Sequence, residues 1–273
     1  MHVPPGHYYS PIVDVADVTG GGSDADTWVD LPGIDVDLAA YAKVWSDWLP
    51  HARRWDEGVG TDRRYHTRNS MFGPQSARLL AAAIGALHPR RYVEVGSGFS
   101  SAVLLDVNQE WRSDDPIALT FIEPHPERLE SILRDGDRDA CTILREKVQS
   151  VDLEVFDALE AGDVLFIDST HVAKTGSDVL REVFEILPRL EPGVHIHLHD
   201  VNYPFDYPRA WLIDENKSWN EAYFLRAFLM YNDRFSIDFW PDALGRFGDG
   251  VGAESVELLV GKPSSIWLSR TRS

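Results

Sequence analysis

The sequence predicts an α/β fold in which a mostly parallel sheet carries helices on both faces. Two observations support this prediction. From residue 75 onward, short apolar segments alternate with segments that show the 3.6-residue period of an amphipathic helix. The apolar segments are hydrophobic at nearly every position, which is typical of parallel strands that are covered on both faces. At 273 residues, the chain has the length of one such domain with additions.

The predicted elements follow one another in the order of a Rossmann-like fold. The first strand runs into a glycine turn, and a helix with three consecutive apolar residues, 103–105, follows it. Strands are predicted over residues 92–95, 118–122, 141–146, 163–167 and 194–199, with two late ones over 235–240 and 265–269. Further helices are predicted over residues 38–48, 79–87, 125–133, 177–190 and 219–232. The complete set gives a seven-stranded sheet.

The regular pattern covers only part of the chain. Residues 1–75 are predicted to be an N-terminal extension or lid, because a single periodic segment interrupts an otherwise irregular stretch. Residues 76–273 are predicted to be the ligand-binding domain, with an irregular insertion at 201–219. Aromatic side chains of the extension and the insertion either line the substrate pocket or serve for packing. These candidates are His7, Tyr8, Tyr9, Tyr203, Phe205, Tyr207 and Trp211.

Composition argues against several classes of partner. The chain carries 26 Lys and Arg against 44 Asp and Glu, a formal net charge of -18 at pH 7. It is poorly suited to nucleic acid or an anionic membrane surface, since both need cationic side chains. The single cysteine, Cys141, excludes an internal disulfide and fits a cytoplasmic location. No leader-like segment follows Met1 and no apolar run reaches about 20 residues, so we expect neither a signal peptide nor a membrane span.

The segment VEVGSGFSS (93–101) predicts a ligand-binding turn. A strand that runs into Gly-Ser-Gly lets the backbone pass very close to a ligand. A dinucleotide site would need a third glycine, but Ser101 occupies that place. Glu94 precedes the turn, and a carboxylate there does not favour two phosphates. A ligand with an ammonium group and a ribose fits better, and S-adenosylmethionine is such a ligand.

A carboxylate at the end of the second predicted strand supports this cofactor. Glu123 in FIEPHPERL can accept hydrogen bonds from both ribose hydroxyls. It lies farther from the glycines than the usual spacing of about 20 residues, and the stretch 108–116 accounts for the excess as an insertion. The alternative is an ordinary strand–turn–helix unit with a surface glutamate. The predicted cofactor-binding residues are Glu94, Gly96, Ser97, Gly98, Ser101 and Glu123.

Carboxylates also follow the fourth and fifth predicted strands. LFIDSTH contains Asp168, with His171 one turn later, and HLHD ends with Asp200. If these strands are neighbours, about 4.8 Å apart, the two aspartates lie side by side at the edge where open α/β sheets bind ligands. We expect Asp168, His199 and Asp200 to hold a divalent metal, Mg, Mn or Fe. The alternative is that the carboxylates cap helices or bind the cofactor.

Three histidines alternate in the fifth predicted strand and therefore share one face. His195 and His197 lie deeper in the sheet, and we expect them to be core side chains that are hydrogen-bonded to neighbours. His199 lies next to the edge, where it either reaches the metal or points away from Asp200.

Several long segments resemble class I S-adenosylmethionine-dependent methyltransferases, in particular a set of bacterial methyltransferases described only as hypothetical. The segments are VEVGSGFSS, FIDSTHVAKTGSDV, EILPRLEPGVHIHLHDVNYPFDYP, WNEAYFLRAFLMYN and the N-terminal GHYYSPIVD, so the resemblance covers nearly the whole chain. It implies the class I methyltransferase fold and S-adenosylmethionine as cofactor.

A more distant resemblance is to metal-dependent O-methyltransferases that act on sugars of natural products. Those enzymes carry Asp-x-x-His at the fourth strand end and two adjacent acidic residues at the fifth. The resemblance implies that Asp168 and Asp200 are metal ligands and that His171 is the general base, so Asp168 and His171 are the predicted catalytic residues. The chain departs from the pattern at His199, where those enzymes have a carboxylate.

These observations predict metal-assisted methyl transfer to a hydroxyl oxygen of a small molecule. One alternative is that the same fold and metal serve a different chemistry. Another is a binding module without catalytic activity. The sequence leaves the acceptor open, and it leaves open whether the chain forms a homo-oligomer.

Overall fold

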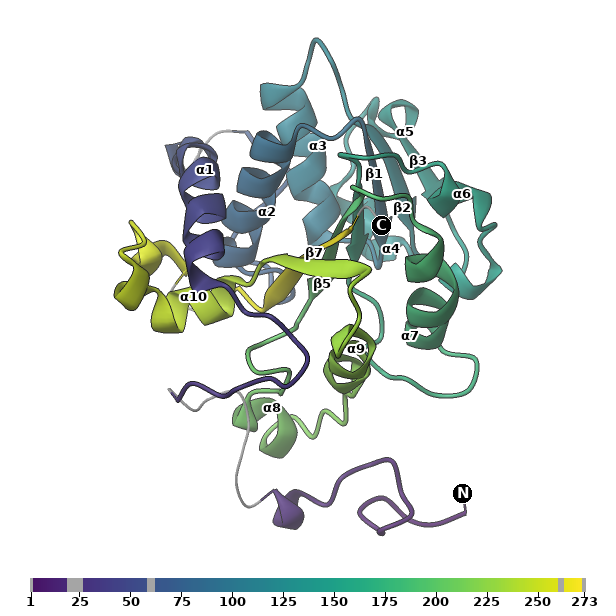
Figure 1. Cartoon of the computed structure of the whole chain (residues 1–273). Coiled ribbons are helices and arrows are strands. Elements are labelled where there is room, and N and C mark those ends of the chain that lie inside the picture. Colours follow the sequence, from purple (N-terminus) through teal and green to yellow (C-terminus); the bar gives the residue numbers. More distant parts are fainter. Residues whose placement is uncertain (1, 19–26, 58–61, 260–262, 272–273) are drawn as a thin grey trace.

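The computed structural model describes residues 2–18, 27–57, 62–259 and 263–271. Seven strands in this part of the chain form one sheet in the order β3-β2-β1-β4-β5-β7-β6 (Figure 1). They are β1 (Arg91–Val95), β2 (Ala118–Ile122), β3 (Cys141–Leu144), β4 (Val164–Ile167), β5 (His195–His199), β6 (Phe235–Phe239) and β7 (Ser265–Arg270). Strands β1 to β5 run parallel, whereas β7 is antiparallel to β5 and to β6. The predicted, mostly parallel seven-stranded sheet is confirmed.

Helices cover both faces of the sheet. In Figure 1, α1, α2 and α3 stack side by side on one face, and α6 and α7 lie on the other. The α-helices of the described residues are α1 (Leu38–Glu57), α2 (Pro74–Leu87), α3 (Phe99–Trp111), α4 (Glu127–Ile132), α5 (Asp137–Ala140), α6 (Glu154–Asp157), α7 (Asp178–Arg181), α8 (Arg209–Ile213), α9 (Glu221–Leu229) and α10 (Pro241–Phe247). Among these residues, we find no helix with the length and apolar character that a membrane crossing requires.

The predicted helix over 177–190 changes its geometry along its length. It begins as α7 behind Ser177, whose side chain accepts a hydrogen bond from the N–H of Leu180. It continues as a π-helical turn over Glu182–Ile186 and ends as a 3-10 turn over Leu187–Arg189. The α pattern ends at Arg181, before the π-helical turn, and a proline at position 188, which has no N–H to donate, lies in the closing 3-10 turn.

Aromatic side chains join the N-terminal helix α1 to the antiparallel end of the sheet. Trp45 and Trp48 of α1 are buried. The Trp48 ring lies 5.0 Å from Phe239 of β6 and 5.2 Å from Trp267 of β7. Helix α1 is therefore part of the hydrophobic core, although it falls within the predicted extension. Residues 2–18 lie apart from that core in Figure 1, and their role as a lid stays a prediction.

Candidate functional site

Neighbouring strand ends bring the predicted site residues to one edge of the sheet. Strand β4 lies between β1 and β5, with Ile167 paired to Val95 on one side and to Leu198 on the other. The segments that follow these residues therefore leave the sheet side by side. A cavity of about 530 Å³ opens there, lined by the segments that follow β1 to β5.

The turn after β1 approaches β4 too closely for any side chain to fit between them. Gly96 has a φ of +85°, and a Cβ atom added there would lie 1.8 Å from the carbonyl oxygen of Asp168. Its φ also lies in the left-handed region, which favours glycine. Glycine at this position therefore serves the packing of the turn against β4, which sets the position of Asp168 at the edge of the cavity.

Glu94 lies beneath the turn and holds it from inside. Its Oε1 accepts hydrogen bonds from the hydroxyls of Ser100 and Ser101, at 2.6 and 2.9 Å. The hydroxyl of Ser101 also accepts from the N–H of Gly98 at 3.0 Å. Burial raises the pKa of Glu94 to about 8, against the lowering effect of the two serines. Glu94 and Ser101 therefore shape the turn and do not line the cavity.

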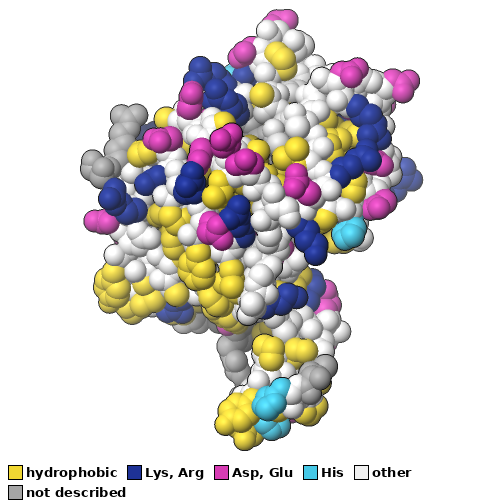
Figure 2. All heavy atoms as spheres, turned by 90° about the vertical axis from the view of Figure 1, so that its right-hand side faces the viewer, with side chains coloured by type: hydrophobic (Ala, Val, Ile, Leu, Met, Phe, Trp, Pro, Cys, Tyr) yellow, Lys and Arg dark blue, Asp and Glu magenta, His cyan; other side chains and the backbone are white. Residues whose placement is uncertain are grey.

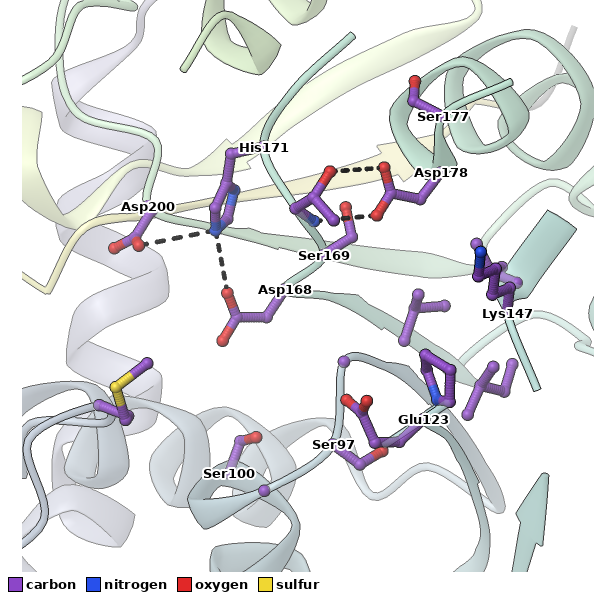
Figure 3. A pocket seen from close by; sticks show the side chains of 18 of the residues that line it. Ser97, Ser100, Glu123, Lys147, Asp168, Ser169, His171, Ser177, Asp178 and Asp200 are labelled. Atoms are coloured by element: carbon purple, nitrogen blue, oxygen red, sulfur yellow. Dashed lines mark hydrogen bonds and ion pairs between the residues drawn. The ribbon is translucent and has the colours of Figure 1, made fainter. Parts of the chain in front are cut away.

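The other predicted cofactor residues do line the cavity. They are Gly96, Ser97, Gly98 and Glu123. Figure 3 shows Ser97 and Glu123 near each other, and Lys147 beyond them on the side of β3. The carboxylate of Glu123 accepts a hydrogen bond from the N–H of His125 at 2.9 Å, which holds the loop after β2 in place.

His171 stands between two carboxylates on the opposite side of the cavity. Its Nε2 lies 3.3 Å from Oδ1 of Asp168 and 3.7 Å from Oδ2 of Asp200 (Figure 3). One ligand atom from each of the three side chains lies within 4.8 Å of the others, which is close enough for one cation. His171 and Asp200 have φ values of 58° and 57°. Such left-handed conformations are uncommon for residues other than glycine and often occur at functional sites.

Glu221, the first residue of α9, fixes the orientation of His171. Its Oε2 lies 2.7 Å from Nδ1 of His171, and both side chains are buried. The N–H groups of Asn220 and Glu221 donate to the carbonyl oxygen of His171, and the Trp219 ring lies 4.3 Å from the imidazole. Because Nδ1 is bound to Glu221, only Nε2 faces the two aspartates. The sequence did not single out Glu221, since nothing in its local pattern connects it with a histidine 50 residues away.

Burial and charge act differently on the three groups. Burial by itself raises the pKa of Asp168, but His199 and the hydrogen bond from His171 outweigh this effect and hold the pKa below its ordinary value. Burial also raises the pKa of Asp200, and the charge of Asp168 raises it further, against His199 and His171. Burial lowers the pKa of His171, but its hydrogen bonds to Asp168 and Glu221 raise it well above the ordinary value. His171 is therefore a base whose protonated form is strongly favoured.

A known protein family matches the part of the chain that contains the strands of this site. Residues 93–201 match the sequence model of a family described as "Methyltransferase domain". An uncharacterized protein of Archaeoglobus fulgidus is 32% identical over 167 residues, which make up 58% of this chain and 73% of that protein. The chain belongs to the class I S-adenosylmethionine-dependent methyltransferase family. The family that the sequence resembles is thereby confirmed.

Two solved structures of methyltransferases share part of this arrangement at low identity. A SAH-bound methyltransferase of Podospora anserina is 12% identical, with a TM-score of 0.49, over 86% of this chain and 94% of the other. An O-methyltransferase of Bacillus cereus in complex with SAH is 14% identical, with a TM-score of 0.37, over 74% and 83% of the two chains. Neither likeness informs the acceptor of this methyltransferase.

The three-residue group differs from the predicted metal site in one member, because it contains His171 in place of His199. The ring of His199 packs 5.0 Å from Phe72, and its Nδ1 lies 3.3 Å from Nε2 of His197. Its Nε2 lies 3.8 Å from Oδ1 of Asp200. Asp200 adopts a left-handed backbone conformation directly after His199, so the chain turns away at this point. His199 therefore contacts Asp200 from behind and is not in the three-residue group.

Of the two deeper histidines, which were expected to be hydrogen-bonded core side chains, His197 lies in the core with Nδ1 unpaired among the described residues, and His195 does not lie in the core. His197 is buried, and its ring stacks 4.4 Å from Phe166 at an interplanar angle of 5°. Trp267 packs edge-on against it at 4.7 Å. Burial lowers the pKa of His197 well below its ordinary value, so it is a neutral core side chain. His195 is half-buried, and its Nδ1 lies 3.6 Å from Oδ2 of Asp238.

Most of the aromatic candidates for the substrate pocket serve for packing. Tyr203, Phe205 and Tyr207 are buried in the core, and Trp211 packs 5.4 Å from Trp219. His7, Tyr8 and Tyr9 stack on one another at the far N-terminal end. None of these seven side chains lines the cavity described above. The large apolar side chains that do line it include Met71, Phe72, Phe99 and Trp219. Met71 and Phe72 lie in an irregular part of the sequence, which gave no signal for them.

Proposed function

We propose that this chain is an S-adenosylmethionine-dependent methyltransferase that methylates a hydroxyl oxygen of a small molecule with the help of a divalent metal. The observation that carries the proposal is the position of the Asp168–His171–Asp200 group at the cofactor cavity, with the imidazole oriented by Glu221. Acidic and basic atoms thereby meet at the place where an acceptor can approach the cofactor.

The cavity fits the cofactor. It contains the carboxylate of Glu123 at the end of β2, where a ribose is held in many open α/β sheets. It also contains the glycine turn, where the backbone lies open to a ligand. When bound, S-adenosylmethionine supplies an electrophilic methyl group on a sulfonium. Glu123 and the turn would fix the cofactor, and holding both reactants at contact distance supplies much of the rate.

The two aspartates of this group fit a divalent metal. Two carboxylates and an imidazole nitrogen converge within 4.8 Å, and carboxylate oxygens are ligands that Mg²⁺ and Mn²⁺ prefer. Asp168 and Asp200 would hold the cation. A cation at this place lowers the pKa of a hydroxyl that binds to it. It also relieves the repulsion between two carboxylates that both approach Nε2 of one histidine.

His171 is proposed to be the base. Its Nδ1 donates to Glu221, so Nε2 is the nitrogen that faces the two aspartates and the cavity, and it would act as the base in its deprotonated form. Nε2 would take the proton of the acceptor hydroxyl, and the buried carboxylate of Glu221 would stabilise the imidazolium that forms. The apolar side chains of Met71, Phe99 and Trp219 line the same cavity and fit an acceptor with an organic body.

Binding measurements on the metal-free protein test the proposal. We expect wild type to bind S-adenosylhomocysteine with micromolar affinity in calorimetry, and Mn²⁺ to bind in a separate titration. D200N should keep the S-adenosylhomocysteine affinity and lose Mn²⁺. H171Q should keep both and lose transfer of a labelled methyl group to hydroxylated small molecules. A folded wild-type protein that does not bind S-adenosylhomocysteine would refute the cofactor, and loss of Mn²⁺ in H171Q would make His171 a ligand.

A further inference from the structure

Two histidines of β5 are buried behind Asp200, one of the two aspartates that would hold the metal. His197 is 2% exposed and His199 is 5% exposed. By contrast, the face of the molecule in Figure 2 exposes many charged side chains, with histidine at only a few places. A polar ring atom that is buried loses its contact with water, so a partner inside the fold is favoured. The partners of the ring nitrogens therefore indicate what the two histidines do.

His197, His199 and the carboxylate of Asp200 form a row, here called the imidazole row. Nε2 of His197 lies 3.3 Å from Nδ1 of His199, which is a hydrogen bond. Nε2 of His199 lies 3.8 Å from Oδ1 of Asp200, where an N–H group and a carboxylate attract each other without a full hydrogen bond. The other oxygen of Asp200, Oδ2, lies 3.7 Å from Nε2 of His171. The carboxylate is therefore contacted by an imidazole on each side.

The imidazole row has two possible directions of hydrogen bonding, and Asp200 favours one of them. A neutral imidazole has one N–H and one lone pair, so each contact in the row needs one donor and one acceptor. If Nδ1 of His199 donates to His197, the lone pair of Nε2 faces the carboxylate and is repelled by it. If the proton is on Nε2, an N–H faces the carboxylate and Nδ1 accepts from His197. Only the second direction makes both contacts favourable.

The inner end of the imidazole row fits the same direction. Burial lowers the pKa of His197 well below its ordinary value, so this ring has a single N–H. When Nε2 donates, the lone pair is on Nδ1, which has no partner among the described residues. The Trp267 ring packs edge-on at 4.7 Å, and its buried N–H also has no acceptor in that part of the chain. The opposite direction would bury a second unpaired donor against this indole, which costs free energy.

Packing holds both imidazole rings in place. The ring of His197 stacks 4.4 Å from Phe166 at an interplanar angle of 5°. The ring of His199 lies 5.0 Å from Phe72 and 6.2 Å from Phe166. Side chains enclosed in this way by aromatic rings keep one orientation, because close packing leaves no room for another rotamer. The imidazole row is therefore a fixed part of the sheet behind the cavity.

We propose that His197 and His199 are positioning residues for Asp200, with His197 donating from Nε2 to His199 and His199 presenting its Nε2–H to the carboxylate. The inference rests on the proposed function, because a carboxylate that is held from behind serves the cation that Asp168 and Asp200 would bind. Carboxylates that bind a metal are commonly oriented by such outer contacts, whose loss costs about ten- to hundredfold in metal affinity. The histidine that replaces a carboxylate in the sequence pattern thereby acts behind the ligand.

Nitrogen NMR of the metal-free protein at pH 7.5 tests the positions of the protons. The histidine rings are labelled with nitrogen-15, and spectra of H197F and H199F identify the signals. In wild type, Nε2 should carry the proton in both rings, which the chemical shifts report because protonated and unprotonated ring nitrogens differ strongly. In H197F, the signal of Nδ1 of His199 should shift, since this atom loses its donor. A proton on Nδ1 of His199 in wild type would overturn the inference.

Calorimetry with Mn²⁺ tests the effect on the metal site. H199F should weaken Mn²⁺ binding about tenfold and H197F about threefold, and both should keep the affinity for S-adenosylhomocysteine within about twofold of wild type. In the H199F background, H197F should have no further effect, because the imidazole row acts on Asp200 through His199. H199Q, whose amide N–H can face the carboxylate, should restore part of the Mn²⁺ affinity and also serves if H199F does not fold.

H195F is the matched control, because His195 lies on the same face of β5 but contacts Asp238 at the other end of the strand. It should bind Mn²⁺ as wild type does. The inference is overturned if H199F keeps the wild-type Mn²⁺ affinity, if the effects of H197F and H199F add, or if H195F weakens Mn²⁺ as much as H197F. If wild type itself binds no Mn²⁺, the metal of the proposed function fails and the inference falls with it.

Discussion

Replacing Glu94 by glutamine is expected to remove a pH dependence from the stability of the fold. Glu94 is fully buried beneath the glycine turn, where it accepts from two serine hydroxyls. Its second oxygen, Oε2, has no hydrogen-bond partner among the described residues. Burial raises the pKa of this carboxyl from 4.5 to about 8. The folded protein therefore keeps a proton on Glu94 that the unfolded chain releases.

The sign of the effect follows from this difference in proton binding. The stability contribution is fully present below pH 4.5 and is lost as the pH rises through about 8. The full shift corresponds to about 5 kcal/mol, of which about 3 kcal/mol falls between pH 5.5 and pH 8.5. Glutamine is neutral at every pH and its oxygen can still accept from both serines. The free energy of unfolding of E94Q should therefore rise by about 3 kcal/mol relative to that of wild type between pH 5.5 and pH 8.5.

Urea denaturation at the two pH values measures the effect, with the nine tryptophans as the fluorescent probe. The lower value stays above the isoelectric point of about 4.8. All other titratable groups are the same in both proteins. The change with pH in the difference between their free energies of unfolding therefore reports on residue 94 alone. If wild type and E94Q lose stability in parallel from pH 5.5 to pH 8.5, Glu94 is ionised in the folded state and the reasoning fails.

Two further variants test the framework of the site. R64M should lower the free energy of unfolding by about 3–5 kcal/mol, because Arg64 joins the buried carboxylates of Asp106 and Asp137 at 3.0 and 2.6 Å. An unchanged urea midpoint would show that these carboxylates do not need their partner. G96A should abolish binding of S-adenosylhomocysteine, because its Cβ would lie 1.8 Å from the carbonyl oxygen of Asp168. Wild-type affinity in calorimetry would show that the turn can move.

The sheet could be predicted from the sequence because each strand carries its own signal. The segment 163–167 is apolar after Asp163 and is followed by Asp168, and the structure has β4 at Val164–Ile167. The sequence also predicted that Asp168 and Asp200 meet, because adjacent parallel strands end at one edge. The first prediction depends only on the pattern of apolar residues, and the second depends in addition on β4 and β5 being adjacent in the sheet.

The rest of the site depends on backbone turns and on distant contacts. The left-handed conformation of His171 and of Asp200 decides which imidazole faces the cavity, and no residue type in either segment requires it. Strand alternation alone therefore pointed to His199. Glu221, the first residue of α9, contacts His171 although it lies 50 residues away, and Trp219, just before α9, packs on the same imidazole; local periodicity does not describe either contact. Pairings of this kind are formed by tertiary packing.

The pKa shifts of Asp168 and Asp200 have opposite directions, so the two carboxylates should affect the stability of the metal-free protein differently. Asp168 has a lowered pKa and a hydrogen bond from His171, so its ionised form stabilises the fold above its pKa. Asp200 lies farther from the same nitrogen, and burial raises its pKa, so its ionised form costs stability as the pH rises. Urea denaturation with a chelator present at pH 7.5 measures this difference. The free energy of unfolding should be about 2 kcal/mol lower in D168N than in wild type, whereas in D200N it should be unchanged or higher. Both variants should lose Mn²⁺ binding. Equal destabilisation by the two substitutions would contradict this assignment, since it would make the two carboxylates equivalent partners of His171.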